Sequence, residues 1–218
     1  MVRAILSGAK TQTRRMLNGH PEGAWISDGL GRITSKHPKQ GRFGLFVRRG
    51  VGTDFPELDI VPCPYGGPGD RLWVRENFCP IYPQDPTYNG GRPIEYDYAA
   101  TYEHGYRLGD SLGIKKKWKP SIHMPRDASR ITLEITSVRV ERLGSINASD
   151  AKAEGIEGQT ECGPWRNYMR EGYWFPEGKD IAPQLSFASL WHSINGPDSW
   201  AANPWVWVIE FKRVYQQQ

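Results

Sequence analysis

Two segments of alternating hydrophobic residues, 130–142 and 205–214, constrain the fold most strongly. In residues 205–214 (WVWVIEFKRV), tryptophan, isoleucine and phenylalanine occupy every second position, which is the periodicity of a β-strand. Residues 130–142 show a similar alternation, and its phase breaks near Ser137, which predicts a bulge or bend there. Two strands of this length predict a fold built around a β-sheet.

Glycine and proline are abundant and separate the remaining elements. The 218 residues include 24 glycines and 17 prolines, which argues against helical repeats and for long loops around a modest core. Helical spacing followed by glycine predicts short helices near residues 2–6, 147–154 and 185–194, the second capped by Asn147 or Ser149. Shorter strands are expected near 11–15, 43–47, 72–74 and 94–102, and loop insertions near 18–60, 80–93 and 157–182. The sequence therefore predicts a single α+β domain over residues 1–218, mainly β with short helices.

The net charge of +4 is unevenly distributed along the chain. Residues 1–130 hold 20 Lys and Arg residues against 13 acidic ones, whereas residues 131–218 hold 8 against 11. The basic residues concentrate in segments 32–49 and 115–130, where Phe43, Phe46 and Trp118 lie between them. The charge balance fits a polyanionic partner and ordinary surface charge about equally. Basic residues interleaved with aromatic ones suit a strand of RNA or DNA better than a free nucleoside.

Cysteine usage and hydropathy limit the cellular setting and the cofactors. Cys63, Cys79 and Cys162 are odd in number and widely spaced, and no secretory signal accompanies them, which predicts a reducing, cytoplasmic environment. The chain has no CxxC or HxxxH pair, so neither a metal nor another cofactor is expected. No apolar run approaches the roughly 18 residues that span a membrane. The sequence does not indicate an oligomeric state.

Residues 8–15 (GAKTQTRR) hold the sharpest cluster of polar side chains. On an extended strand, Thr11, Thr13 and Arg15 share one face, and Lys10 lies at the turn before them. A threonine hydroxyl beside a buried lysine of lowered pKa can act as a nucleophile. The same lysine and arginine without such tuning bind a phosphate. A charged strand edge in water is the third interpretation.

The motif and the order of elements resemble a known family. Gly8, Lys10, Thr13 and Arg15 match the GxKxxTxR motif of the ASCH family, a branch of the PUA-like superfamily. A short helix before the motif, a Pro-Gly-Asp turn before a strand, and an Ala-Glu-Gly helix end also match. Segments 68–78, 120–156 and 187–214 are similar to ASCH proteins of tailed phages and prophages, often labelled morphogenetic. The resemblance implies a PUA-like β-barrel flanked by helices, in the cytoplasm of a bacterial host cell. It also predicts that a strand that usually precedes the first helix is missing here.

The chemistry that this resemblance implies differs among family members. Some ASCH enzymes are amidohydrolases of acetylcytidine nucleosides, and their roles would fall on Lys10 as base, Thr13 as nucleophile and Glu154 as proton donor. A base, a nucleophile and an acid are the groups that amide cleavage needs. Other members are reported to bind or cleave RNA. The phage relatives also allow a non-catalytic assembly protein.

Further residues are predicted to contact a nucleic acid or a modified nucleoside. Glu76 is a second carboxylate candidate, although a salt bridge at a strand end is the favoured explanation; the adjacent Arg75 could pair with it or bind a phosphate. His123 is a candidate acid or base for phosphodiester cleavage, and a hydrogen bond to a loop carbonyl is its structural alternative. The predicted binding set consists of Arg14, Arg15, Trp73, Arg75, Glu76, Trp118, His123 and Arg126. We therefore expect a binding domain for nucleic acid or a modified nucleoside that uses a Lys/Thr/Arg pocket. A hydrolase and a non-catalytic assembly protein are the alternatives.

Overall fold

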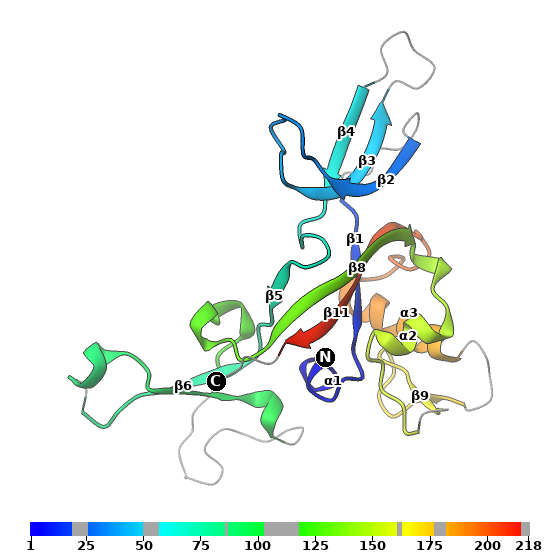
Figure 1. Ribbon diagram of the computed structural model, residues 1–218. Helices are drawn as coiled ribbons and strands as arrows, with labels where there is room; N and C mark the ends of the chain where they lie inside the picture. Colours follow the sequence, from blue (N-terminus) through cyan, green and yellow to red (C-terminus); the bar gives the residue numbers. More distant parts are fainter. Residues whose placement is uncertain are drawn as a thin grey trace.

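A curled, half-barrel sheet of four antiparallel strands organises the molecule (Figure 1). The computed structural model describes residues 1–18, 26–49, 57–85, 87–102, 118–160, 163–176 and 182–214. The strand order is β1 (Gln12–Met16), β11 (Trp205–Val214), β8 (Thr132–Arg142) and β5 (Arg71–Trp73). The predictions of a mainly β, α+β fold and of a last strand over residues 205–214 are confirmed.

The pairing of β8 with β11 contains the predicted bulge. Glu210 pairs with Ser137, and the next residue, Phe211, pairs with Ile135. Thr136 is therefore the extra residue on β8, and the break in alternation near Ser137 marks a real irregularity. Such a bulge bends the strand and increases the local twist, which suits a sheet that curls.

Strand β11 is covered on both faces, so it separates two hydrophobic cores. Val206 and Val208 pack on one face with helix α2 (Ala148–Ala153) and helix α3 (Ala182–Asn195). Trp207 and Ile209 pack on the other face, against a second sheet. All four side chains are at most 1% exposed, and burying chains of this size stabilises a fold by about 1.5–3 kcal/mol each.

The second sheet corrects the expectation of a loop insertion at 18–60. It consists of β2 (Ile26–Arg32), β3 (Phe43–Arg49) and β4 (Glu57–Pro62) in the order β2-β3-β4. Only the strand near 43–47 was expected. The segment ISDGLGR shows no hydrophobic alternation, and its register with β3 shifts between Ser27 and Gly29, so it is the pairing with β3 that defines it as a strand. Residues 19–25 and 50–56 lie outside the described residues.

The remaining elements are short. Helix α1 (Val2–Leu6) packs beside the end of the main sheet, as the sequence predicts. Strands β6 (Phe78–Ile81) and β7 (Glu95–Tyr98) form a hairpin, as do β9 (Trp165–Arg166) and β10 (Trp174–Phe175), so the expected loops 80–93 and 157–182 are not wholly irregular. Single 3₁₀ turns occupy Ala99–Thr101, Ser121–His123, Arg126–Ala128 and Leu143–Ser145, whereas Tyr88–Gly91 is an irregular turn in which Asn89 and Gly90 have positive φ. The strand expected at 94–102 thus ends at Tyr98.

The ends of α2 place the residues that matter for the site. The side chain of Asn147 accepts a hydrogen bond of 2.8 Å from the backbone N–H of Asp150, which makes Asn147 the N-cap. The helix ends at Ala153, Glu154 is its C-cap, and Gly155 takes a positive φ of 75°. Among the helices of the described segments, none has the length and hydrophobicity to cross a lipid bilayer.

Candidate functional site

Lys10 and Glu154 form a buried ion pair that joins the start of β1 to the end of α2. The Lys10 ammonium donates to a Glu154 carboxylate oxygen at 2.9 Å and to the Glu154 carbonyl at 2.7 Å. The two residues are 5% and 3% exposed. Burial lowers the pKa of Lys10 because it disfavours the charged amine, and the Glu154 carboxylate opposes that shift. Lys10 of the motif and Glu154 of the helix end are therefore in direct contact.

Arg14 lies beside this pair and is surrounded by carboxylates. Its guanidinium donates to Glu154 at 3.4 Å, to Asp150 at 2.9 Å and also to Glu141. The Arg14 side chain has no exposed surface, and its guanidinium lies 5.9 Å from the centre of the Phe187 ring. Arg14 thus links β1 to β8 and α2 in the interior, and a ligand on the surface does not reach it.

Arg139 extends the network on its outer side. It donates to Asp150 at 2.8 Å and to Gln12 at 3.1 Å, and it pairs with Glu141 and Glu210. The buried charges are therefore compensated by partners, as the cost of burying an isolated ion requires.

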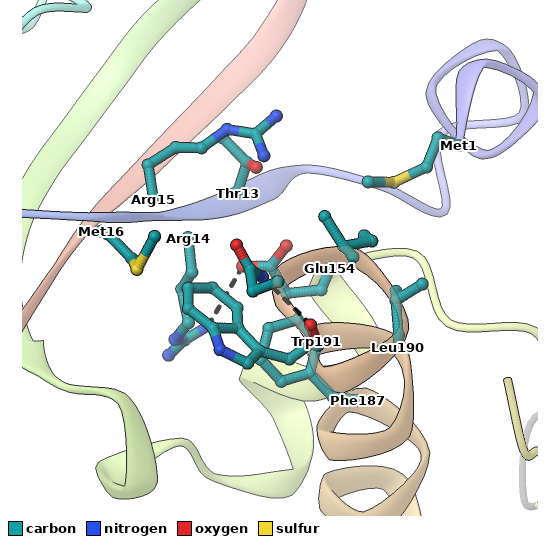
Figure 2. A pocket seen from close by; sticks show the side chains of 11 residues that line it. Met1, Thr13, Arg14, Arg15, Met16, Glu154, Phe187, Leu190 and Trp191 are labelled. Atoms are coloured by element: carbon teal, nitrogen blue, oxygen red, sulfur yellow. Dashed lines mark hydrogen bonds and ion pairs between the residues drawn. The ribbon is translucent and has the colours of Figure 1, made fainter. Parts of the chain in front are cut away.

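Thr13 and Arg15 lie on the other side of β1. Figure 2 shows these two side chains above the strand and Arg14 with Glu154 below it. Alternation on a strand explains this arrangement: Gln12 and Arg14 are buried, whereas Thr13 is half-buried and Arg15 exposed. Among the described residues, the Thr13 hydroxyl has no hydrogen bond to Lys10 or Glu154.

The cavity next to Thr13 is small. It has a volume of about 40 Å³ and is lined by residues of β1, by Glu154 and by apolar residues of α3, including Phe187, Leu190 and Trp191 (Figure 2). A water molecule needs roughly 10–15 Å³ of such volume, so the cavity holds about three waters. Sites for small molecules are usually about 300–1,000 Å³, which leaves no room for a nucleoside here.

A much larger groove lies at the other side of the Lys10–Glu154 pair. Its volume is about 1060 Å³ and its walls come from α1, the segment between β5 and β6, and the turn that follows Glu154. Three residues of the predicted binding set line it: Arg75, Glu76 and Trp118. The other polar residues of its lining are Arg3, Ser7, Asn77, Ser121, Glu157 and Arg166.

Glu76 is a buried carboxylate at the edge of this groove. It is 2% exposed, and Arg130 donates to both of its oxygens at 2.9 Å in a bidentate pair. The Arg130 guanidinium in turn lies 4.1 Å from the centre of the Tyr98 ring. The salt-bridge interpretation of Glu76 therefore describes its geometry, with Arg130 rather than the adjacent Arg75 as the partner.

Trp73, Arg75 and Arg126 form an arginine–indole cluster at the rim of the groove. The guanidinium carbons of Arg75 and Arg126 lie 4.6 Å and 5.8 Å from the centre of the Trp73 ring. His123 is exposed in the neighbouring 3₁₀ turn, and the carbonyl of Ile122 accepts a 3.3 Å hydrogen bond from Arg75. Lys115, Lys116 and Lys117 lie outside the described residues.

The basic segment 32–49 does not join the groove. It belongs to the second sheet, which Figure 1 shows at the opposite end of the molecule from α1 and β6. Two of its cations are paired, Arg32 with Asp70 and Lys39 with Asp59. Of the two basic stretches in the sequence, only the one that ends at Arg130 contributes to the candidate site.

Several residues that line the groove could not be predicted from the sequence. Arg3 lies on α1 and donates to the carbonyls of Ala100 and Tyr102, so it connects the helix to the segment that follows β7. The Tyr102 ring lies 5.8 Å from that of Trp118. Arg166 belongs to the hairpin β9–β10, which was expected to be a loop. Only the folded chain brings these distant segments together.

The comparisons with known proteins identify no family for this chain. The chain matches no protein-family model, and no curated protein or solved structure is significantly similar to it. In the part of the chain that the structure describes, no three His, Cys, Asp or Glu side chains are grouped so that they could hold a metal ion.

Proposed function

We propose that this chain is a binding protein for nucleic acid or a modified nucleoside, of the ASCH type, and that a base of the ligand enters the groove between α1 and Trp118. The observation that carries the proposal is the groove itself. Its volume of about 1060 Å³ suits a nucleotide-sized ligand, and it joins the predicted binding residues Arg75, Glu76 and Trp118.

The groove residues offer the contacts that a base requires. Trp118 is half-buried beside Tyr102, so its indole is held in place while part of it remains open to a ligand. Stacking on an aromatic side chain contributes about 1–3 kcal/mol per base. Both Glu76 oxygens accept from Arg130, and their remaining lone pairs can accept from an amino group, such as that of cytosine.

The Lys10–Glu154 pair supports this groove from behind. Gly155, which follows Glu154, lines the groove, as does Ala9, which precedes Lys10. The ion pair therefore fixes the two chain segments that form one wall. This role accounts for a buried lysine and a buried glutamate without assigning either a chemical step.

The amidohydrolase alternative finds less support in the geometry. It requires the Thr13 hydroxyl, Lys10 and Glu154 to face one substrate. Thr13 and Glu154 line one cavity, but their side chains lie on opposite sides of β1, and the cavity has only about 40 Å³ (Figure 2). No observation favours the non-catalytic assembly protein.

The proposal is tested by the affinity of the chain for a fluorescent 12-nucleotide single strand, measured by anisotropy at about 50 mM salt. Trp118→Ala should weaken binding by roughly 5- to 150-fold, the equivalent of one lost base stack. Trp174→Ala is the matched control, because Trp174 is also half-buried but lies on β10 outside the groove. Equal affinities for Trp118→Ala and the unmodified chain, with both folded by circular dichroism, would contradict the proposal.

A further inference from the structure

We infer that the cluster of Trp73, Arg75 and Arg126 is a phosphate-binding track that continues the groove, so that the ligand is a single-stranded polynucleotide rather than a free nucleoside. This inference rests on the proposed function and narrows its ligand class. A base in the groove at Trp118 would leave the backbone of its strand at the rim, where the cluster lies.

The two guanidinium groups of the cluster carry uncompensated charge. Neither Arg75 nor Arg126 pairs with a carboxylate among the described residues, whereas Arg130 pairs with Glu76 and Arg166 with Glu157. The acidic residue that follows each arginine in sequence has another partner: Glu76 accepts from Arg130, and Asp127 accepts a 3.4 Å hydrogen bond from the Tyr96 hydroxyl. Two cations held together without a carboxylate attract an anion from solution.

Stacking on Trp73 prepares both arginines for such an anion. A guanidinium that lies against an indole ring is ordered by the ring and keeps the N–H groups of its edge available for bidentate contact with a phosphate. Because 4.6 Å and 5.8 Å are measured to one ring centre, the two guanidinium carbons cannot be farther apart than the sum of these distances. That separation is within about one Debye length at 0.1 M salt, so both act on the same stretch of strand.

The cluster is continuous with the groove. Arg75 belongs to both, since it lines the groove and lies against Trp73. Arg75 also donates to the carbonyl of Ile122, a residue that is 71% exposed, so the chain beside the cluster is open to solvent. Lys119 and His123 are exposed on the same short segment. The surface therefore offers further donors along the direction of a bound strand.

A purely structural role for the stacked arginines is the competing explanation, and the chain offers a matched control for it. Arg142 lies 4.6 Å from the centre of the Trp205 ring, the same distance as Arg75 from Trp73, but outside the groove lining. If stacking alone explains these arginines, then Arg126→Ala and Arg142→Ala should have the same effect on nucleic-acid binding, namely none.

The experiment compares cytidine, cytidine monophosphate and a cytidine 12-mer as ligands of the full chain, each over a range of salt concentrations. The affinity should increase with each added phosphate. Each phosphate contact of a single strand adds about −0.7 to the slope of log K against log salt, so Arg126→Ala should reduce the slope for the 12-mer by about 0.7 and its affinity about five-fold. The Arg75→Ala/Arg126→Ala double variant should reduce the slope by about 1.4. Arg142→Ala should change neither quantity.

The outcomes separate this inference from the proposed function. Cytidine binding that depends on Trp118, with no gain from added phosphates, would overturn the track and leave the groove in place. Equal losses for Arg126→Ala and Arg142→Ala would also overturn it. Inorganic polyphosphate that binds as tightly as the 12-mer would show a general polyanion site and contradict a polynucleotide ligand. A 12-mer slope that falls only in the Arg75 and Arg126 variants supports the track.

Discussion

Replacing Lys10 by methionine removes one half of a buried ion pair while it keeps the volume of the side-chain stem. The carboxylate of Glu154 then loses its 2.9 Å partner and keeps only the 3.4 Å contact with Arg14, and the Glu154 carbonyl loses its 2.7 Å donor. Removing one partner of a buried pair costs about 3–5 kcal/mol, because the other charge stays buried without compensation. The remaining contact with Arg14 places the expected loss near the lower end, about 3 kcal/mol.

A loss of this size is measurable by thermal unfolding. For a chain of 150–250 residues, 1 kcal/mol shifts Tm by roughly 2–4 °C, so Lys10→Met should lower Tm by about 6–12 °C. The matched control is Lys212→Met, because Lys212 is 62% exposed and its 2.8 Å ion pair with Glu134 lies at the surface. Surface pairs contribute about 0–1 kcal/mol. Equal shifts for both variants would refute the claim that the Lys10 pair is buried and structural.

Three further predictions concern the same region. Gly155→Ala should destabilise the fold by about 2–5 kcal/mol in a urea titration, because the residue has a positive φ and the added Cβ would lie 2.7 Å from the Lys10 Cβ. The control is Gly196→Ala, which should cost only about 1–2 kcal/mol, because Gly196 also has a positive φ but open space around it. The pKa of Lys10 should lie below its ordinary value of 10.5, so the unfolded chain binds more protons and the contribution of Lys10 to stability should rise with pH between the two values. NMR of the lysine side-chain nitrogen checks this shift, and a Lys10 titration at or above 10.5 would contradict it. The chain should release no acetate from acetylcytidine, as measured by a coupled acetate assay, because Thr13 faces away from Glu154; turnover that Thr13→Val abolishes would contradict this geometry.

The elements with strong local signals were predictable from the sequence. Alternation placed β11 and the bulge of β8, and the cap residue Asn147 with Gly155 placed the ends of α2. Strand β2 could not be predicted, because its residues do not alternate and its structure depends on pairing with β3 across an irregular register. Tertiary pairing of this kind has no signature in a short window of sequence.

The site was predictable in part, for a similar reason. The motif predicted Lys10 as a site residue, and the helix end predicted Glu154. The two residues are 144 residues apart in sequence and in contact in the fold. The alternation of β1 also placed Thr13 and Arg15 on one face. The local sequence does not show which face of β1 packs against α2. The burial of Arg14 and the separation of the Thr13 side chain from Glu154 could therefore be found only from the structure.

The position of the bound strand tests the central claim most directly. A single-stranded oligonucleotide that carries 4-thiouridine can be crosslinked to the full chain with ultraviolet light, and the modified peptides can be identified by mass spectrometry. Binding in the groove predicts crosslinks to the peptides that contain Trp118 and Tyr102, whose rings lie 5.8 Å apart, and the loss of these crosslinks in Trp118→Ala. Crosslinks confined to the basic segment 32–49 of the second sheet would place the ligand at the other end of the molecule and contradict the proposed site.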